Sequence, residues 1–313
     1  MTRPSESGLS RPRLEAGAAA LVGGLLRALP RRAALALGRS LGAFWGDLDR
    51  RHVAIAAGHL RQAYPDWDEG RVLRTARGVY RHFGQVLFDL LWLQGRPRET
   101  VLGVVDFAGR EHVEAAIAAG RGVVYATGHL GNWEVHALAH SWEWGPVGVV
   151  ARPLDNPALD ARLVAFRRQG GNTVIYKERA LVQVLRILRD GGGVAILMDQ
   201  NVVASDGIFV PFFGRPAATT TVSAALAVKT GAALVPCHVE TLPTGRYRVV
   251  YEAPLDLAAS SSRQDEVARL TREMTARIEA WVRANPEQWL WMHRRWKTQP
   301  SAAEPGSPLD IRQ

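Results

Sequence analysis

From residue 99 onward, short apolar runs alternate with longer segments of helical periodicity, and this alternation constrains the fold more than any other feature. Four runs have the length and branched composition of buried strands: Val123 to Ala126, Val147 to Ala151, Val174 to Tyr176 and Val194 to Met198. Helices are predicted between them, including Asn156 to Arg168 and Arg179 to Asp190. The pattern predicts an α/β fold, with a mostly parallel sheet covered by helices on both faces.

Polar residues follow three of the predicted strands. His129 comes just after the first, Arg152 ends the second, and Asp199 and Gln200 follow the fourth. Ligands of open parallel sheets bind beyond the carboxyl ends of the strands. We therefore expect these side chains to converge on one edge of the sheet.

The stretch Thr-Gly-His-Leu-Gly-Asn-Trp-Glu contains His129 and Glu134, five positions apart. On one regular helix these side chains would point about 140° apart, so they could not meet on a helical face. A turn made possible by Gly128 and Gly131, with Asn132 as N-cap of the next helix, would let Glu134 reach the imidazole. His129 could then act as a general base on a hydroxyl.

The alternative is that His129 and Glu134 have no chemical role. Acidic residues favour the first turn of a helix in any case, and a histidine is common in a loop. On spacing alone, both interpretations stay open.

The sequence around this pair resembles the His-x4-Asp/Glu box of the glycerolipid acyltransferase superfamily. More narrowly, it resembles the lipid A biosynthesis (lauroyl/myristoyl) acyltransferases of Gram-negative bacteria. Two further stretches carry the same resemblance, Phe209 to Pro216 and Pro286 to Lys297, so that it covers most of Val101 to Lys297.

The resemblance implies an enzyme that needs no cofactor or metal. It would move an acyl chain from an acyl carrier protein or acyl-CoA thioester to a hydroxyl of a glycolipid such as a lipid A precursor, at the cytoplasmic face of the bacterial inner membrane. His129 and Glu134 would be catalytic, without a covalent acyl-enzyme. Backbone N–H groups near Gly131 and Asn132 are candidate donors to the oxyanion.

The expected substrate-binding residues lie mainly at positions that match the family. Arg152 and Arg167 match basic positions associated with phosphate or glycolipid headgroups, and a guanidinium fork suits phosphate oxygens. Asp199 and Gln200 match an Asp-Gln pair, for which a strand-end cap is the alternative role. Asn132 completes the set.

The chain before residue 99 is predicted to be helical and membrane-associated. Ala16 to Leu26 is uncharged, but its eleven residues are too few to span a bilayer. Basic residues interleaved with apolar and aromatic ones favour a helix lying in the membrane interface, with a signal peptide as the alternative. The predicted organisation is a disordered segment 1–13, a helical region 14–98, an α/β domain 99–299 and a disordered tail 300–313.

One apolar stripe within this region runs along Val72 to Leu91 at spacings of three and four residues. It is predicted to pack on the α/β domain, with exposure of part of it to lipid as the alternative.

A formal net charge of +9 indicates an anionic partner, and the absence of a zinc-finger or RNA-binding signature argues against nucleic acid. The single Cys237 excludes an intrachain disulfide. Two other functions are weighed. A metal-dependent hydrolase could use His129, His136 and His140, and a lipid-binding protein could keep the fold without catalysis.

Overall fold

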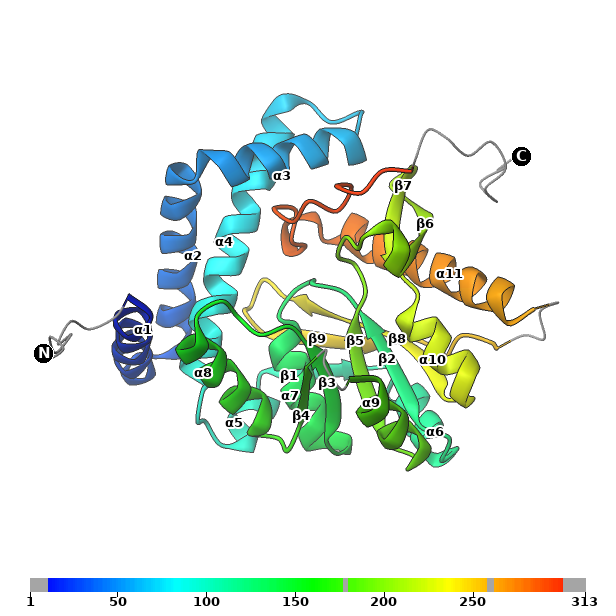
Figure 1. Ribbon diagram of the computed structural model, residues 1–313. Helices are drawn as coiled ribbons and strands as arrows, with labels where there is room; N and C mark the ends of the chain where they lie inside the picture. Colours follow the sequence, from blue (N-terminus) through cyan, green and yellow to red (C-terminus); the bar gives the residue numbers. More distant parts are fainter. Residues whose placement is uncertain (1–10, 177–179, 258–261, 301–313) are drawn as a thin grey trace, which may run out of the picture.

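The computed structural model describes residues 11–176, 180–257 and 262–300, in which long N-terminal helices lie against an α/β sandwich (Figure 1). The helices are α1 (Arg11–Ala28), α2 (Arg31–Leu48), α3 (Arg50–Ala63), α4 (Glu69–Leu93), α5 (Arg98–Leu102), α6 (Arg110–Ala118), α7 (Trp133–Trp144), α8 (Pro157–Arg168), α9 (Ala180–Arg189), α10 (Val222–Thr230) and α11 (Arg263–Ala284). Two short 3-10 helices are Ala204–Asp206 and Pro286–Gln288.

The main sheet has seven strands in the order β1-β9-β8-β2-β5-β3-β4. Their bounds are β1 (Val105–Ala108), β2 (Val123–Thr127), β3 (Val147–Ala151), β4 (Thr173–Tyr176), β5 (Gly193–Leu197), β8 (Ala233–Thr241) and β9 (Tyr247–Tyr251). A separate hairpin pairs β6 (Gly207–Phe212) with β7 (Arg215–Thr220). The four predicted strands and the predicted helix Asn156 to Arg168 are confirmed to within one residue at each end. The helix predicted from Arg179 to Asp190 is confirmed as α9, except that Arg179 lies outside the described residues.

Five neighbouring strands, β8, β2, β5, β3 and β4, run parallel, whereas β9 is antiparallel to β8. The pairing of β2 with β5 places Thr127 beside Leu197, so both strands end at the same level. Residues that follow these two strands therefore meet at one edge of the sheet. The mostly parallel sheet is confirmed.

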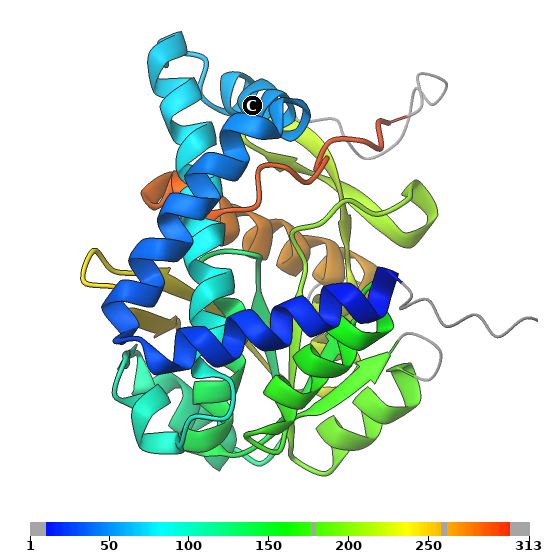
Figure 2. The ribbon, with the colours of Figure 1, turned by 90° about the vertical axis from the view of Figure 1, so that its left-hand side faces the viewer.

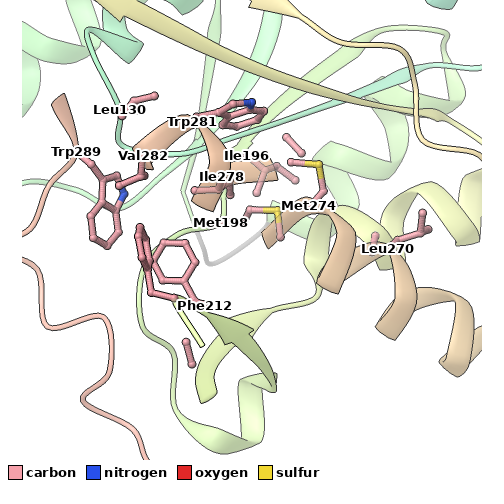
Figure 3. Close-up of a cluster of buried hydrophobic side chains, with 14 of the residues drawn as sticks. Leu130, Ile196, Met198, Phe212, Leu270, Met274, Ile278, Trp281, Val282 and Trp289 are labelled. Carbon is pink, nitrogen blue, oxygen red and sulfur yellow. The ribbon is translucent and has the colours of Figure 1, made fainter. Parts of the chain in front are cut away.

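Alternate residues of β2 point into different cores. Val124 and Ala126 join the core formed with α9, α10, α11 and the first half of α4, whereas Val123 and Tyr125 join the core formed with α6 and α7. Figure 3 shows part of the first core, where Ile196 and Met198 lie near side chains of α11. The sheet is thus covered on both faces, as fully buried parallel strands require.

The apolar stripe of α4 packs as predicted over most of its length. Val72, Ala76 and Val79 are fully buried and share a core with the sheet, whereas Leu87 is 55% exposed. Asp68 starts this helix by accepting a hydrogen bond from the backbone N–H of Arg71 at 2.8 Å. Helices before residue 99 therefore share one hydrophobic core with the sheet of the α/β fold.

The predicted termini are described only in part. Residues 1–10 and 301–313 lie outside the described residues, whereas residues 11–13, predicted to be disordered, belong to α1. Within the described ranges, no helix combines the length and the apolar character needed to cross a membrane.

Helix α2 packs closely on α4 because glycines line the crossing (Figure 2 shows the two helices side by side). A Cβ atom on Gly38 would lie 2.7 Å from the carbonyl oxygen of Gly84, and one on Gly42 would collide with the backbone of Tyr80. The two helix backbones can approach this closely only without side chains at these positions.

Replacing Gly42 with alanine should therefore destabilise the protein, by about 1–3 kcal/mol, because the added methyl overpacks the crossing. Gly58→Ala is the matched control, since a Cβ on that helical glycine meets nothing within 4 Å. It should be neutral or stabilise by up to about 1 kcal/mol. The measurement is the free energy of unfolding in urea, and equal values for the two variants would contradict the packing described.

Candidate active site

The turn between β2 and α7 carries His129 and has the predicted local structure. Gly131 adopts a left-handed backbone with φ of +60°, and the side chain of Asn132 caps α7 by accepting from the N–H of Val135 at 3.2 Å. Gly128 lies against Asp199, where a Cβ would come 3.0 Å from the carboxylate. The predicted turn, N-cap and position past the strand are confirmed.

The carboxylate that holds the imidazole is that of Asp199. Its Oδ1 lies 2.7 Å from His129 Nδ1, and its Oδ2 accepts from the backbone N–H of His129 and from the indole N–H of Trp289, each at 2.7 Å. Asp199 follows β5 and is only 4% exposed. The predicted convergence of residues after β2 and β5 is confirmed.

These contacts determine the charge of Asp199. Burial by itself would raise the pKa of this carboxyl, but the charge and hydrogen bonds of His129 and the hydrogen bond from Trp289 lower it to about 2. Asp199 is thus an anion at neutral pH. Because an ionised carboxylate can only accept, the Nδ1 of His129 donates to it, and the ring is oriented with Nε2 facing away from Asp199.

Nε2 of His129 faces a pocket. The side-chain amide nitrogen of Gln200 lies 3.3 Å from it, and Gln200 is exposed. A substrate hydroxyl that displaced this exposed amide would lie directly against Nε2, the ring nitrogen that Asp199 does not hold. The arrangement is that of a general base held by a buried carboxylate.

Glu134 has a different partner from the one expected. Its two carboxylate oxygens accept from Nε and a terminal nitrogen of Arg167 at 2.8 and 2.6 Å, and Oε1 also accepts from the indole of Trp133 at 3.0 Å. The first turn of α7 directs Glu134 toward α8 rather than back toward His129. The expected contact of Glu134 with the imidazole is therefore wrong, and Asp199 takes that place.

Arg167 is correspondingly a buried ion-pair partner. Burial would lower the pKa of its guanidinium, but the hydrogen bonds and charge of Glu134 raise it. Its fork is matched to one carboxylate in the bidentate arrangement that arginine favours. Arg167 still lines the pocket, as does Arg152, which is exposed at the end of β3.

Two further expectations about the turn are corrected. The side chain of Asn132 is fully buried, and its amide donates to the hydroxyl of Tyr247 at 3.0 Å, so it is not positioned to bind substrate. The N–H of Gly131 donates to the carbonyl of Gln288 at 3.0 Å, so it cannot also serve an oxyanion. Both groups hold the turn in place.

The pocket in front of His129 has a volume of about 960 Å³. Its polar side is formed by His129, Arg152, Arg167 and Gln200. Its apolar side includes Val150, Leu154, Leu163, Leu181, Val184 and Leu226. A cavity of this size and character accommodates an amphipathic molecule.

His136 and His140 lie on one face of α7, as their spacing predicts, but they are not assembled with His129. Their rings lie 3.1 and 2.7 Å from the hydroxyl of Tyr251, and burial lowers both pKa values to about 3. In the described parts of the chain, no three His, Cys, Asp or Glu side chains are grouped as metal ligands would be. The metal set weighed from the sequence is therefore not formed there.

Two residues that shape the site are not among those expected from the sequence. Trp289 fixes Asp199, and its segment also pairs with Leu130 of the turn by an isolated β-bridge. Tyr247 on β9 holds Asn132. Trp289 lies in a stretch already used for the family resemblance, which was the available signal, whereas nothing local marks Tyr247.

Arg167→Met should lower the free energy of unfolding by about 3–5 kcal/mol, because it leaves the buried Glu134 carboxylate without its partner. The Arg167→Met/Glu134→Met double variant should recover most of that loss. Arg168→Met is the control, since Arg168 is the next residue on the same helix and its side chain is exposed. The free energies of unfolding of these three variants are measured in urea. If Arg167→Met were as stable as Arg168→Met, the buried ion pair would be contradicted.

Comparison with known proteins gives a consistent result. A model of the bacterial lipid A biosynthesis acyltransferase family matches residues 13–298. A phosphatidylinositol mannoside acyltransferase of Mycobacterium tuberculosis is 32% identical over 250 residues, 79% of this chain and 76% of that protein. The lipid A biosynthesis lauroyltransferase of Escherichia coli is 27% identical over 266 residues, 84% of this chain and 85% of its own.

Among solved structures, the 1-acyl-sn-glycerophosphate acyltransferase PlsC from Thermotoga maritima aligns with a TM-score of 0.34 and 14% identity, over 80% of this chain and 100% of its own.

Proposed function

The chain belongs to the family of bacterial lipid A biosynthesis acyltransferases, and from that premise we propose that it acylates a hydroxyl of a membrane glycolipid with a fatty acyl chain taken from a thioester. It is an O-acyltransferase of the lipid A and glycolipid type. The observation that carries the mechanism is the contact of the buried Asp199 carboxylate with His129, which lines the large pocket.

In this mechanism His129 is the general base. Nε2 removes the proton of the acceptor hydroxyl while its oxygen attacks the thioester carbonyl, which forms a C–O bond. The C–S bond then breaks, and the imidazolium returns the proton to the leaving thiolate. Asp199 keeps the required tautomer and stabilises the imidazolium, so both steps need its negative charge.

Glu134 acts through Arg167 in this proposal. The ion pair holds a guanidinium against the pocket, and Arg152 adds a second positive charge at the mouth. The fork of Arg167 is taken by Glu134, so the exposed guanidinium of Arg152 is the group that suits an acceptor with phosphate or other anionic groups. The apolar side of the same pocket suits the acyl chains of the substrates.

The donor is proposed to be an acyl carrier protein or coenzyme A thioester. Both are acidic, and the chain has a formal net charge of +9. The proposed acceptor is a lipid A precursor or related glycolipid, because one relative is named for lipid A and another for phosphatidylinositol mannoside. The expected place of action is the cytoplasmic face of the inner membrane.

His129→Ala should lower kcat by about 10²–10⁴-fold, since positioned proton transfer contributes that much. Asp199→Asn should lower kcat in the same range with KM nearly unchanged, because the lost charge matters mainly in the transition state. His112→Ala, a change on the outer helix α6, is the control.

The assay is thioester-dependent acylation of a glycolipid, followed by mass spectrometry. It is repeated after exhaustive chelation, where activity should persist. Activity that disappears with chelator and returns with zinc would contradict the proposed mechanism in favour of metal-dependent chemistry.

Membrane attachment is proposed to involve one face of α2. Leu37, Leu41, Phe44 and Leu48 recur at spacings of three and four residues and are 42–60% exposed. Leu21 and Leu25 are further exposed apolar side chains on α1, which meets α2 at the corner after Ala28 (Figure 2). Arginines interleave with these residues, as is typical of a helix at an anionic membrane surface.

Changing Leu41, Phe44 and Leu48 together to glutamine should weaken partition onto anionic vesicles by about tenfold or more, since burial of each apolar side chain contributes about 1.5–3 kcal/mol. The free energy of unfolding should change little, because these side chains are exposed. Ile117→Gln, an exposed change on α6, is the control. Vesicle co-sedimentation that is equal for both would contradict the assignment of this face.

A further inference from the structure

A continuous path of polar side chains joins helix α2 to the catalytic turn. Arg31, the first residue of α2, donates to both carboxylate oxygens of Asp89 on α4, at 2.8 and 2.6 Å. The hydroxyl of Tyr247 on β9 donates to the same carboxylate, and Asn132 donates to that hydroxyl at 3.0 Å. Asp89, Tyr247 and Asn132 are fully buried.

The charge at one end of this path sets the direction of every hydrogen bond along it. The carboxylate of Asp89 accepts from Arg31, and it also accepts from the hydroxyl of Tyr247. The Tyr247 oxygen then accepts from the amide nitrogen of Asn132, which turns the Asn132 oxygen toward the N–H of Val135. That last bond caps α7, three residues after His129.

A buried ion pair is a poor means of stabilising a fold, because desolvation offsets most of its attraction. Its common use is to fix one arrangement among several similar ones. Here the arrangement fixed is that of the turn, which also receives the long 3.4 Å contact of His82 on α4 with the carbonyl of Gly131. The path therefore fixes the geometry of the turn, in addition to any effect on the stability of the fold.

We propose that Arg31 is a positioning residue for catalysis, which acts through Asp89, Tyr247 and Asn132 to hold the catalytic turn in the geometry that proton transfer requires. This inference rests on the proposed acyl transfer for its kinetic test. It assigns to α2 a role in the chemical step in addition to the membrane contact proposed for its outer face.

The variants are Tyr247→Phe, which removes only the hydroxyl, and Arg31→Met. Each should lower kcat by roughly 10- to 100-fold, since small displacements of a catalytic group have effects of that order, and leave KM for the donor unchanged. Arg31→Lys, which keeps the charge, should recover part of the loss. The double variant Arg31→Met/Tyr247→Phe should have a kcat no lower than that of the slower single variant, because both changes interrupt one path.

Arg39→Met is the matched control. Arg39 joins the same two helices through Gln85 at 2.6 Å, but that bond does not continue to Tyr247. It should leave kcat within about twofold of wild type. A loss equal to that of Arg31→Met, a loss confined to KM, or losses that multiply in the double variant would each overturn the proposal.

Two measures keep the test decisive. If Arg31→Met does not fold, the double variant Arg31→Met/Asp89→Asn is used in its place. This double variant removes the buried carboxylate charge together with its partner. Amide hydrogen exchange of residues 129–135, faster in the path variants than in Arg39→Met, reports on the turn without any substrate. Inactive wild-type protein would refute the proposed function, whereas unchanged exchange and unchanged kcat in the path variants would refute only the positioning role.

Discussion

The site depends on keeping one buried carboxylate, that of Asp199, ionised. In an apolar interior this group would by itself favour its neutral form, and a neutral acid could not support an imidazolium. Three donors prevent that: the ring and backbone of His129, and the indole of Trp289. The end of β5, the turn after β2 and the segment around Trp289 are therefore bound together by one charge.

Parallel pairing explains how residues 70 positions apart come to share that charge. Because β2 and β5 are neighbours with Thr127 beside Leu197, the backbone leaves both strands at the same level. His129 and Asp199 then need only a tight turn and a short extension to meet. Helix α7 begins at that point, and its first turn leads Glu134 to Arg167, so the site has two carboxylates with separate tasks.

Local patterns in the sequence predicted much of this, namely the strands, the glycine turn, the Asn132 cap and the edge at which the polar residues gather. The identity of the partner of His129 depended on strand order, which apolar runs alone do not encode. Proximity in sequence favoured Glu134, but helix direction separates it from the ring. Tyr247 comes from a segment with no local sign of its contact with Asn132, and the family resemblance around Trp289 does not reveal its contact with Asp199.

The bridge between Leu130 and Trp289 also has a consequence for the order of synthesis. The turn behind β2 leaves the ribosome early, but Gln288, which accepts from Gly131, and Trp289, which holds Asp199, follow only after every strand of the sheet has been made. A nascent chain can thus complete its sheet while Asp199 still lacks the indole donor of Trp289. The last contacts around Asp199 therefore form only after the helices that precede the sheet have already been available to dock.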